Sequence, residues 1–135
     1  MALIVVVGPD AALLEGLSQT LVGAGYEVLV AADIPETLES LRGEHPLMAV
    51  VHRDELIRSG AGFRLALAKG GALLSFQTDD MEEDHLPFAL KRATLAELRL
   101  PLERHRLLAL AHHVESRIHI TGRDVSEESE ERLRD

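Results

Sequence analysis

The chain has 135 residues, enough for one domain with its own hydrophobic core. Its hydrophobic fraction of 46% is that of a folded protein, and because only 3% of the residues are aromatic the core must be aliphatic. A formal net charge of −9 argues against a broad nucleic-acid or anionic-membrane surface, and the absence of cysteine excludes disulfides, thiol catalysis and cysteine-ligated zinc.

Strands and helices are predicted to alternate through the first third of the chain. Residues 3–7 (LIVVV) are a β-branched run typical of a strand buried on both faces, and the run is too short for a signal sequence or a membrane span. Asp10 then stands at a helix cap, and leucines recur at helical spacing as far as Gly23 and Gly25. A second strand (26–31), a second helix (33–43, capped by Asp33) and a third strand (48–51) follow, so we expect a cytoplasmic protein with a parallel sheet.

The middle and end of the chain give weaker patterns. We predict a loop over 53–62, a short helix over 63–68, a strand over 72–76, an acidic loop to residue 84 and a poorly defined helix over 85–93. A fifth strand (96–100) ends at Pro101, and a long helix covers 102–118. The order predicts an α/β domain over residues 1–120, with residues 121–135 as an acidic tail or linker, either disordered or leading to a further module.

This order resembles the receiver domain of two-component response regulators over residues 2 to about 118. The pieces that carry the resemblance run from LIVVVGPD at residues 3–10 to MAVV at 48–51, and include LRLPLERHRLLAL at 98–110. The resemblance implies a flavodoxin-like (βα)5 fold, a five-stranded parallel sheet of order 2-1-3-4-5, and a role in bacterial signal transduction.

The phosphorylation site of that family is altered here. Receivers place an acidic pair after the first strand, and these positions fall on Gly8 and Pro9. The phosphoacceptor aspartate at the end of the third strand falls on His52. The lysine that ends the fifth strand, just before a proline, falls on Leu100, which precedes Pro101. Attack on phosphorus by a carboxylate needs a hard cation and an ammonium group to neutralise the phosphoryl oxygens. We therefore predict a degenerate pseudo-receiver that is not an enzyme and has no cofactor or metal.

Polar residues remain at several positions of the site, and they leave alternative functions open. The hydroxyl position falls within the stretch from Ser75 to Thr78, so a hydroxyl is still available there, and Asp10 is explained as a helix cap. Asp54 lies two residues beyond His52, which would place it about 6–7 Å further along if the strand continued. One alternative is a receiver that is still phosphorylated through Asp54 and Asp10. Another is a small-ligand sensor that uses the altered pocket.

The last helix is the predicted site of association. Its apolar positions exceed one core-facing stripe, and in receivers the fourth helix, fifth strand and fifth helix form the usual partner surface. We expect a protein partner or a homodimer to bind there, with no nucleic acid and no membrane involved. The interface candidates are Leu108, His112, Arg117 and Ile118.

Overall fold

Five parallel strands form a sheet in the order β2-β1-β3-β4-β5 in the computed structural model, which describes residues 2–59, 66–78 and 88–117. The strands are Leu3–Val7 (β1), Glu27–Ala31 (β2), Met48–His52 (β3), Ala72–Gln77 (β4) and Thr94–Arg99 (β5). This strand order confirms the predicted flavodoxin-like fold.

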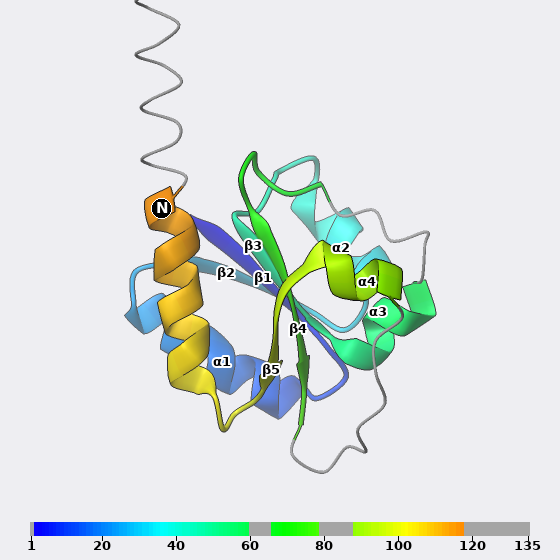
Figure 1. Cartoon of the computed structure of the whole chain (residues 1–135), viewed down its shortest axis with the longest axis horizontal. Coiled ribbons are helices and arrows are strands. Elements are labelled where there is room, and N and C mark those ends of the chain that lie inside the picture. The colour runs from blue at the N-terminus through cyan, green and yellow to red at the C-terminus, as the bar shows by residue number, and fades with distance from the viewer. Residues whose placement is uncertain (1, 60–65, 79–87, 118–135) are drawn as a thin grey trace, which may run out of the picture.

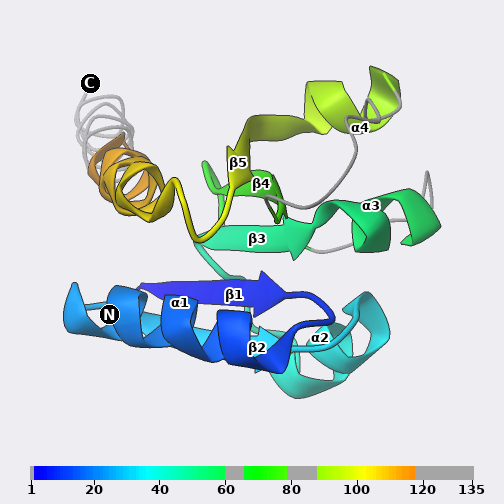
Figure 2. The ribbon, with the colours of Figure 1, turned by 90° about the horizontal axis from the view of Figure 1, so that it is seen from below.

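Helices cover both faces of the sheet. They are α1 (Ala11–Gly23), α2 (Ile34–Leu41), α3 (Arg53–Ser59), α4 (Phe88–Ala93) and a last helix over residues 104–117. Figures 1 and 2 show α1 and the last helix, coloured yellow to orange, on one side of the sheet, and α2 and α3 on the other. The arrangement has three layers, as parallel sheets with crossover helices require.

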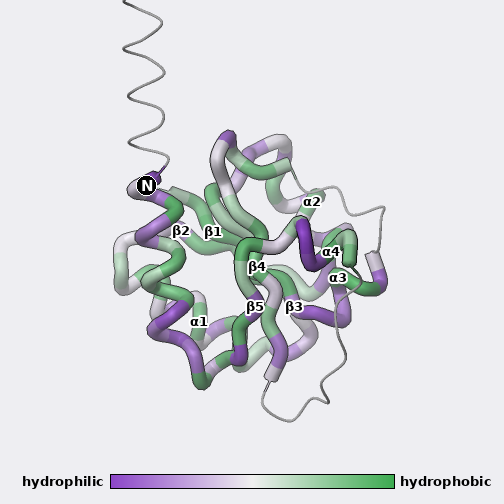
Figure 3. The backbone as a smooth tube through the Cα atoms, viewed as in Figure 1, coloured by the Kyte–Doolittle hydropathy of each residue, from purple (hydrophilic) through white to green (hydrophobic). Residues whose placement is uncertain are grey.

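The alternation of side chains along each strand divides the core in two. Ile4, Val6 and Val50 face α1 and the last helix, whereas Val5 and Val51 face α2 and α3. Figure 3 shows the central strands as hydrophobic along their length, with hydrophilic segments on the outer helices. The burial of both faces explains why the sequences of β1 and β3 are continuous apolar runs.

The predicted helix caps are confirmed. Asp10 accepts a hydrogen bond from the Leu13 amide at 3.2 Å at the start of α1. Asp33 accepts from the Glu36 amide at 2.9 Å at the start of α2. Each carboxylate satisfies a backbone donor that the helix itself leaves free.

The segment after β3 differs from the prediction. A loop was expected from residue 53, but α3 begins directly at Arg53. Asp54 and Glu55 in its first turn and Arg58 in its last turn suit the helix dipole, and Leu56 anchors the helix in the core. Of the helix expected over residues 63–68, residues 66–68 are not helical and the remainder lies outside the described residues.

The fifth strand is also shifted, whereas α4 agrees with the described part of the predicted fourth helix. The expected strand over 96–100 instead covers Thr94–Arg99, and α4 runs straight into it. Leu100 follows the strand, although its amide still donates to the Gln77 carbonyl oxygen at 3.0 Å. The acidic loop from residue 79, the beginning of the predicted fourth helix and the tail from residue 118 lie outside the described residues.

Candidate functional site

The ends of three neighbouring strands bring Gly8, His52 and Phe76 together. Val7 pairs with Val51 and His52 pairs with Phe76, so Gly8, the residue after β1, lies level with the other two. The carboxyl edge of such a sheet is where α/β proteins bind their ligands. Of the residues predicted from the sequence, Gly8 and His52 meet at this edge, together with Phe76, which the prediction did not contain.

His52 stands where a receiver has its phosphoacceptor aspartate. It is 6% exposed at the end of β3, and its Nδ1 accepts a hydrogen bond from the Asp54 amide at 3.1 Å. Burial lowers the pKa of His52, while the nearby carboxylates of Asp54 and Glu55 act in the opposite direction. The imidazole is thus held neutral, with its proton on Nε2 because Nδ1 acts as an acceptor.

Phe76 fills the position level with His52 on the next strand. The two rings meet edge to face, with centroids 5.2 Å apart and planes at 90°, and Phe76 is 1% exposed. The hydroxyl position that the sequence left between Ser75 and Thr78 is therefore taken by the benzyl ring between them. Ser75 pairs with Val51 and belongs to the opposite face of the sheet, whereas Thr78 lines the pocket beyond the strand end.

Gly8 and Pro9 replace the acidic pair, and the space beside Gly8 is closed. A Cβ atom at Gly8 would lie 3.1 Å from Cζ of Phe76 and 3.2 Å from Cβ of His52. A carboxylate could enter only if Phe76 moved. Asp10 is the one acidic residue among those lining the pocket, and one of its oxygens already caps α1.

Leu100 replaces the lysine. It is fully buried in the hydrophobic cluster below α1 and the last helix, and its peptide bond to the exposed Pro101 is cis. No ammonium group from this position can reach the end of β3.

A magnesium ion, which the resemblance implies for an active receiver, does not fit these residues. The positions of the acidic pair carry no oxygen ligands, and His52 replaces the acceptor carboxylate. Within residues 2–59, 66–78 and 88–117, no three His, Cys, Asp or Glu side chains gather in a way that could hold a metal ion.

Asp54 does not lie on an extension of β3. It belongs to the first turn of α3, its side chain is 57% exposed, and its Oδ2 lies 4.0 Å from Nδ1 of His52. The 6–7 Å separation expected for a continued strand does not apply, because α3 begins as soon as β3 ends.

Arg53 is a buried cation that sequence reasoning missed. It is 7% exposed, and one guanidinium nitrogen donates to Oε1 of Gln77 at 3.2 Å. The other nitrogen is buried and has no hydrogen-bond partner among the described residues. A polar run at a strand end looks exposed in the sequence, and only the immediate start of α3 buries this side chain.

A pocket of about 150 Å³ opens beside these residues. Its walls come from the start of α1 and the ends of β3 and β4. The lining residues are Pro9, Asp10, Leu13, Leu14, His52, Phe76 and Thr78.

The candidate interface residues on the last helix differ in how exposed they are. Leu108 is half-buried and packs against the core, whereas His112 is exposed. Arg117 is exposed and donates to the Gly70 carbonyl oxygen at 3.4 Å. Ile118 lies outside the described residues.

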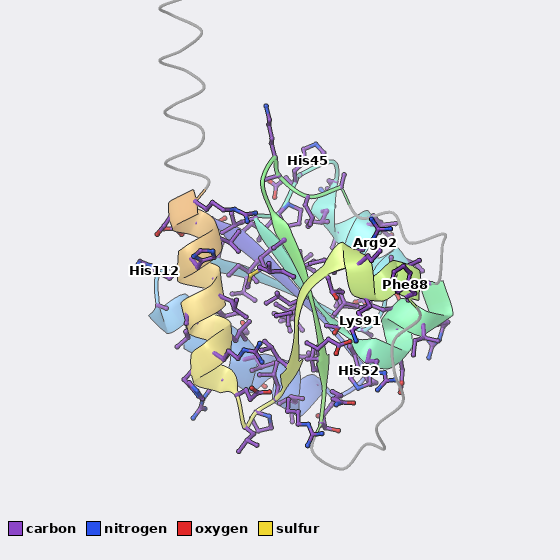
Figure 4. The ribbon with its side chains drawn as sticks, in the orientation of Figure 1. His45, His52, Phe88, Lys91, Arg92 and His112 are labelled. Atoms are coloured by element: carbon purple, nitrogen blue, oxygen red, sulfur yellow. The ribbon has the colours of Figure 1, made fainter. Side chains whose placement is uncertain are left out.

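A more exposed apolar group lies on α4 and β5. Phe88 is 75% exposed, and the guanidinium carbon of Arg92 lies 5.8 Å from the centre of its ring. Leu95 on β5 is 43% exposed. Figure 4 shows Phe88, Lys91 and Arg92 together on α4.

Comparison with solved structures identifies the fold. A CheY-like response-regulator receiver domain protein from Methanospirillum hungatei matches with a TM-score of 0.63 and 21% identity, over 86% of this chain and 95% of that one. A receiver domain protein from Clostridium thermocellum matches with a TM-score of 0.63 and 16% identity, over 90% and 99%. NtrX from Brucella abortus, solved with ADP, matches with a TM-score of 0.66 and 18% identity, over 94% of this chain and 29% of that one.

The chain thus has the fold of response-regulator receiver domains. No protein-family model and no curated protein sequence matches it. In the part of the chain that the structure describes, no helix is long and apolar enough to cross a bilayer.

Proposed function

We propose that this chain, whose fold is that of response-regulator receiver domains, is a non-catalytic pseudo-receiver in bacterial signal transduction. It acts in the cytoplasm as a protein–protein interaction or regulatory module, and it does so without aspartyl phosphorylation. The observation that carries the proposal is the Phe76 ring, which packs against His52 and closes the space beside the Gly8 backbone, where receivers hold their acidic pair.

The chemistry of phosphoryl transfer supports this assignment. A phosphoryl group brings negative oxygens that must be neutralised by a cation and positioned donors. This edge of the sheet instead offers a neutral imidazole, an apolar ring and, at Leu100, a buried aliphatic side chain. The remaining carboxylates, Asp10 and Asp54, would add repulsion without a counter-charge from these positions.

The same fold leaves a surface suited to a partner. Phe88 and Leu95 expose apolar area beside Lys91 and Arg92 on a chain whose net charge is −9. Exposed aromatic and arginine side chains are the commonest anchors of protein interfaces. We propose that the partner surface runs from α4 and β5 onto the last helix, where Leu108, His112, Arg117 and Ile118 were predicted to take part.

We propose the domain division that the sequence predicts. Residues 1–120 would be the interacting domain, and residues 121–135 an acidic tail or linker.

Deletion of the last helix would not test the interface, because Leu107, Ala111 and Val114 on that helix are completely buried and the domain would unfold. Surface substitutions avoid this problem. We expect Phe88→Ser to weaken self-association in sedimentation velocity, or to abolish capture of a specific partner by the immobilised chain. Val22→Ser is the matched control, because Val22 is a 56% exposed apolar residue on α1. Equal effects of the two substitutions, or no effect of Phe88→Ser on any association, would contradict the proposed surface.

A further inference from the structure

His52 presents to the pocket a hydrogen-bond donor for which the described residues supply no acceptor. Its side chain is 7% exposed, and Nδ1 is occupied as an acceptor for the Asp54 amide. The proton therefore resides on Nε2, at the part of the ring far from the backbone, and no described side chain or backbone group accepts it. A ligand that displaces water from this pocket must supply an acceptor for Nε2, because a donor that loses water without gaining another acceptor costs about 1–3 kcal/mol.

The rest of the pocket restricts what that acceptor can belong to. Leu13, Leu14 and Phe76 form apolar walls, which suit a ring rather than an ion. The volume of about 150 Å³ corresponds to a cavity that holds one six-membered ring. Asp10 lines the same pocket as an exposed carboxylate, and only its Oδ1 is engaged in capping α1.

Charge favours a cationic ligand over an anionic one. The start of α1 would attract an anion through its free amides, but the Asp10 carboxylate already occupies that end of the helix. The lysine position carries Leu100, and the whole chain has a net charge of −9. A phosphate or carboxylate ligand would approach against this charge.

We propose that this pocket binds a compact heteroaromatic amine. The ring lies between Leu13, Leu14 and Phe76, its ring nitrogen accepts the hydrogen bond from Nε2 of His52, and its ammonium group pairs with the Asp10 carboxylate. The site thus takes a ligand of opposite charge to the phosphoryl group that receivers accept. This inference does not depend on the partner surface proposed above.

The test is a titration of the full chain with 3-(aminomethyl)pyridine, followed by protein-observed NMR at about pH 8, where the pyridine and His52 are both neutral and the amine is protonated. Two analogues separate the contacts: benzylamine lacks the ring acceptor, and 3-methylpyridine lacks the amine. We expect each analogue to bind about three- to tenfold more weakly, the loss expected for one hydrogen bond or ion pair. Nicotinate, which has the opposite charge, should bind more weakly still.

Two substitutions assign the contacts to their residues. His52→Phe keeps a ring against Phe76 but removes the donor, so it should abolish the preference for the pyridine over benzylamine. Asp10→Asn keeps a capping side chain for α1 and should abolish the preference for the amine over 3-methylpyridine. Each variant tests one contact, so the result from one of them can be interpreted even if the other fails to fold.

The proposal is overturned if the wild-type chain binds 3-(aminomethyl)pyridine no better than benzylamine and 3-methylpyridine, if nicotinate binds best, or if both folded variants keep the wild-type preferences. None of these results bears on the Phe88 surface, so the two proposals can fail separately.

Discussion

Replacing Gly8 by alanine should destabilise the domain, because a methyl group there meets two buried side chains. The added Cβ would lie 3.1 Å from Cζ of Phe76 and 3.2 Å from Cβ of His52, closer than ordinary van der Waals contact. Overpacking of this kind in a rigid core costs about 1–3 kcal/mol. Alanine also restricts the unfolded chain, which stabilises the fold by about 0.4–1 kcal/mol. The free energy of unfolding should therefore fall by about 1–2 kcal/mol in total.

Gly16→Ala provides a matched control for the same chemical change. Gly16 lies in α1, eight positions along the chain from Gly8, and an added Cβ would have no other atom within 4 Å. Alanine in an exposed helical position is better than glycine by about 0.5–1 kcal/mol. The two variants should therefore shift the free energy of unfolding in opposite directions, as measured by urea denaturation with unchanged m-values.

A double-mutant cycle tests the cause. In a Phe76→Leu background the contact with Cζ is gone, so Gly8→Ala should cost less than it does in the wild type. If Gly8→Ala leaves the stability unchanged or raises it, or if its cost is the same with Leu at position 76, then Phe76 does not close the space in which receivers hold their acidic pair.

Two further predictions concern the buried polar side chains. Burial lowers the pKa of His52 below its ordinary 6.5, so the unfolded chain binds a proton at this imidazole more readily than the folded chain does. The free energy of unfolding should therefore be at its full value above about pH 6.5 and should fall as the pH is lowered towards the pKa of the folded state. In denaturation measured over a series of pH values, His52→Phe should reduce this dependence of stability on pH, whereas His112→Gln, at an exposed position, should leave it unchanged. An equal dependence in the wild type and both variants would contradict the burial of a neutral imidazole. Arg53→Met removes a guanidinium nitrogen that is buried without a partner in the described structure, so it should raise the free energy of unfolding by about 1 kcal/mol, the lower end of the cost of an unsatisfied buried group. Arg104→Met at an exposed position is its control, with an expected change within about 0.5 kcal/mol, and a clear loss of stability in Arg53→Met alone would show that the bond to Gln77 outweighs the unpaired nitrogen.

The features that the sequence predicted well are those fixed by local patterns. The apolar run of β1 and the caps at Asp10 and Asp33 depend on neighbouring residues, and the structure has them where they were expected. The alternation of strands and helices allows few topologies, which is why the strand order could be predicted.

The features that were missed depend on how distant segments meet. Phe76 lies level with His52 because of the register between β3 and β4, and no residue pattern within either strand specifies that register. Arg53 is buried because α3 starts without a connecting loop. As the first residue of that helix, it directly follows β3 and its side chain is covered. A search for large apolar residues at the ends of adjacent strands would have pointed to Phe76 but not to its contact with Gly8.

The central claim is that this receiver fold no longer performs phosphoryl chemistry, and intact mass spectrometry tests it most directly. The full chain is incubated with acetyl phosphate and Mg²⁺, beside a receiver that retains its acidic pair, aspartate and lysine. We predict that the control gains the mass of one phosphoryl group and that this chain gains none. A stable gain of one phosphoryl group that Asp54→Asn or His52→Phe abolishes would contradict the account.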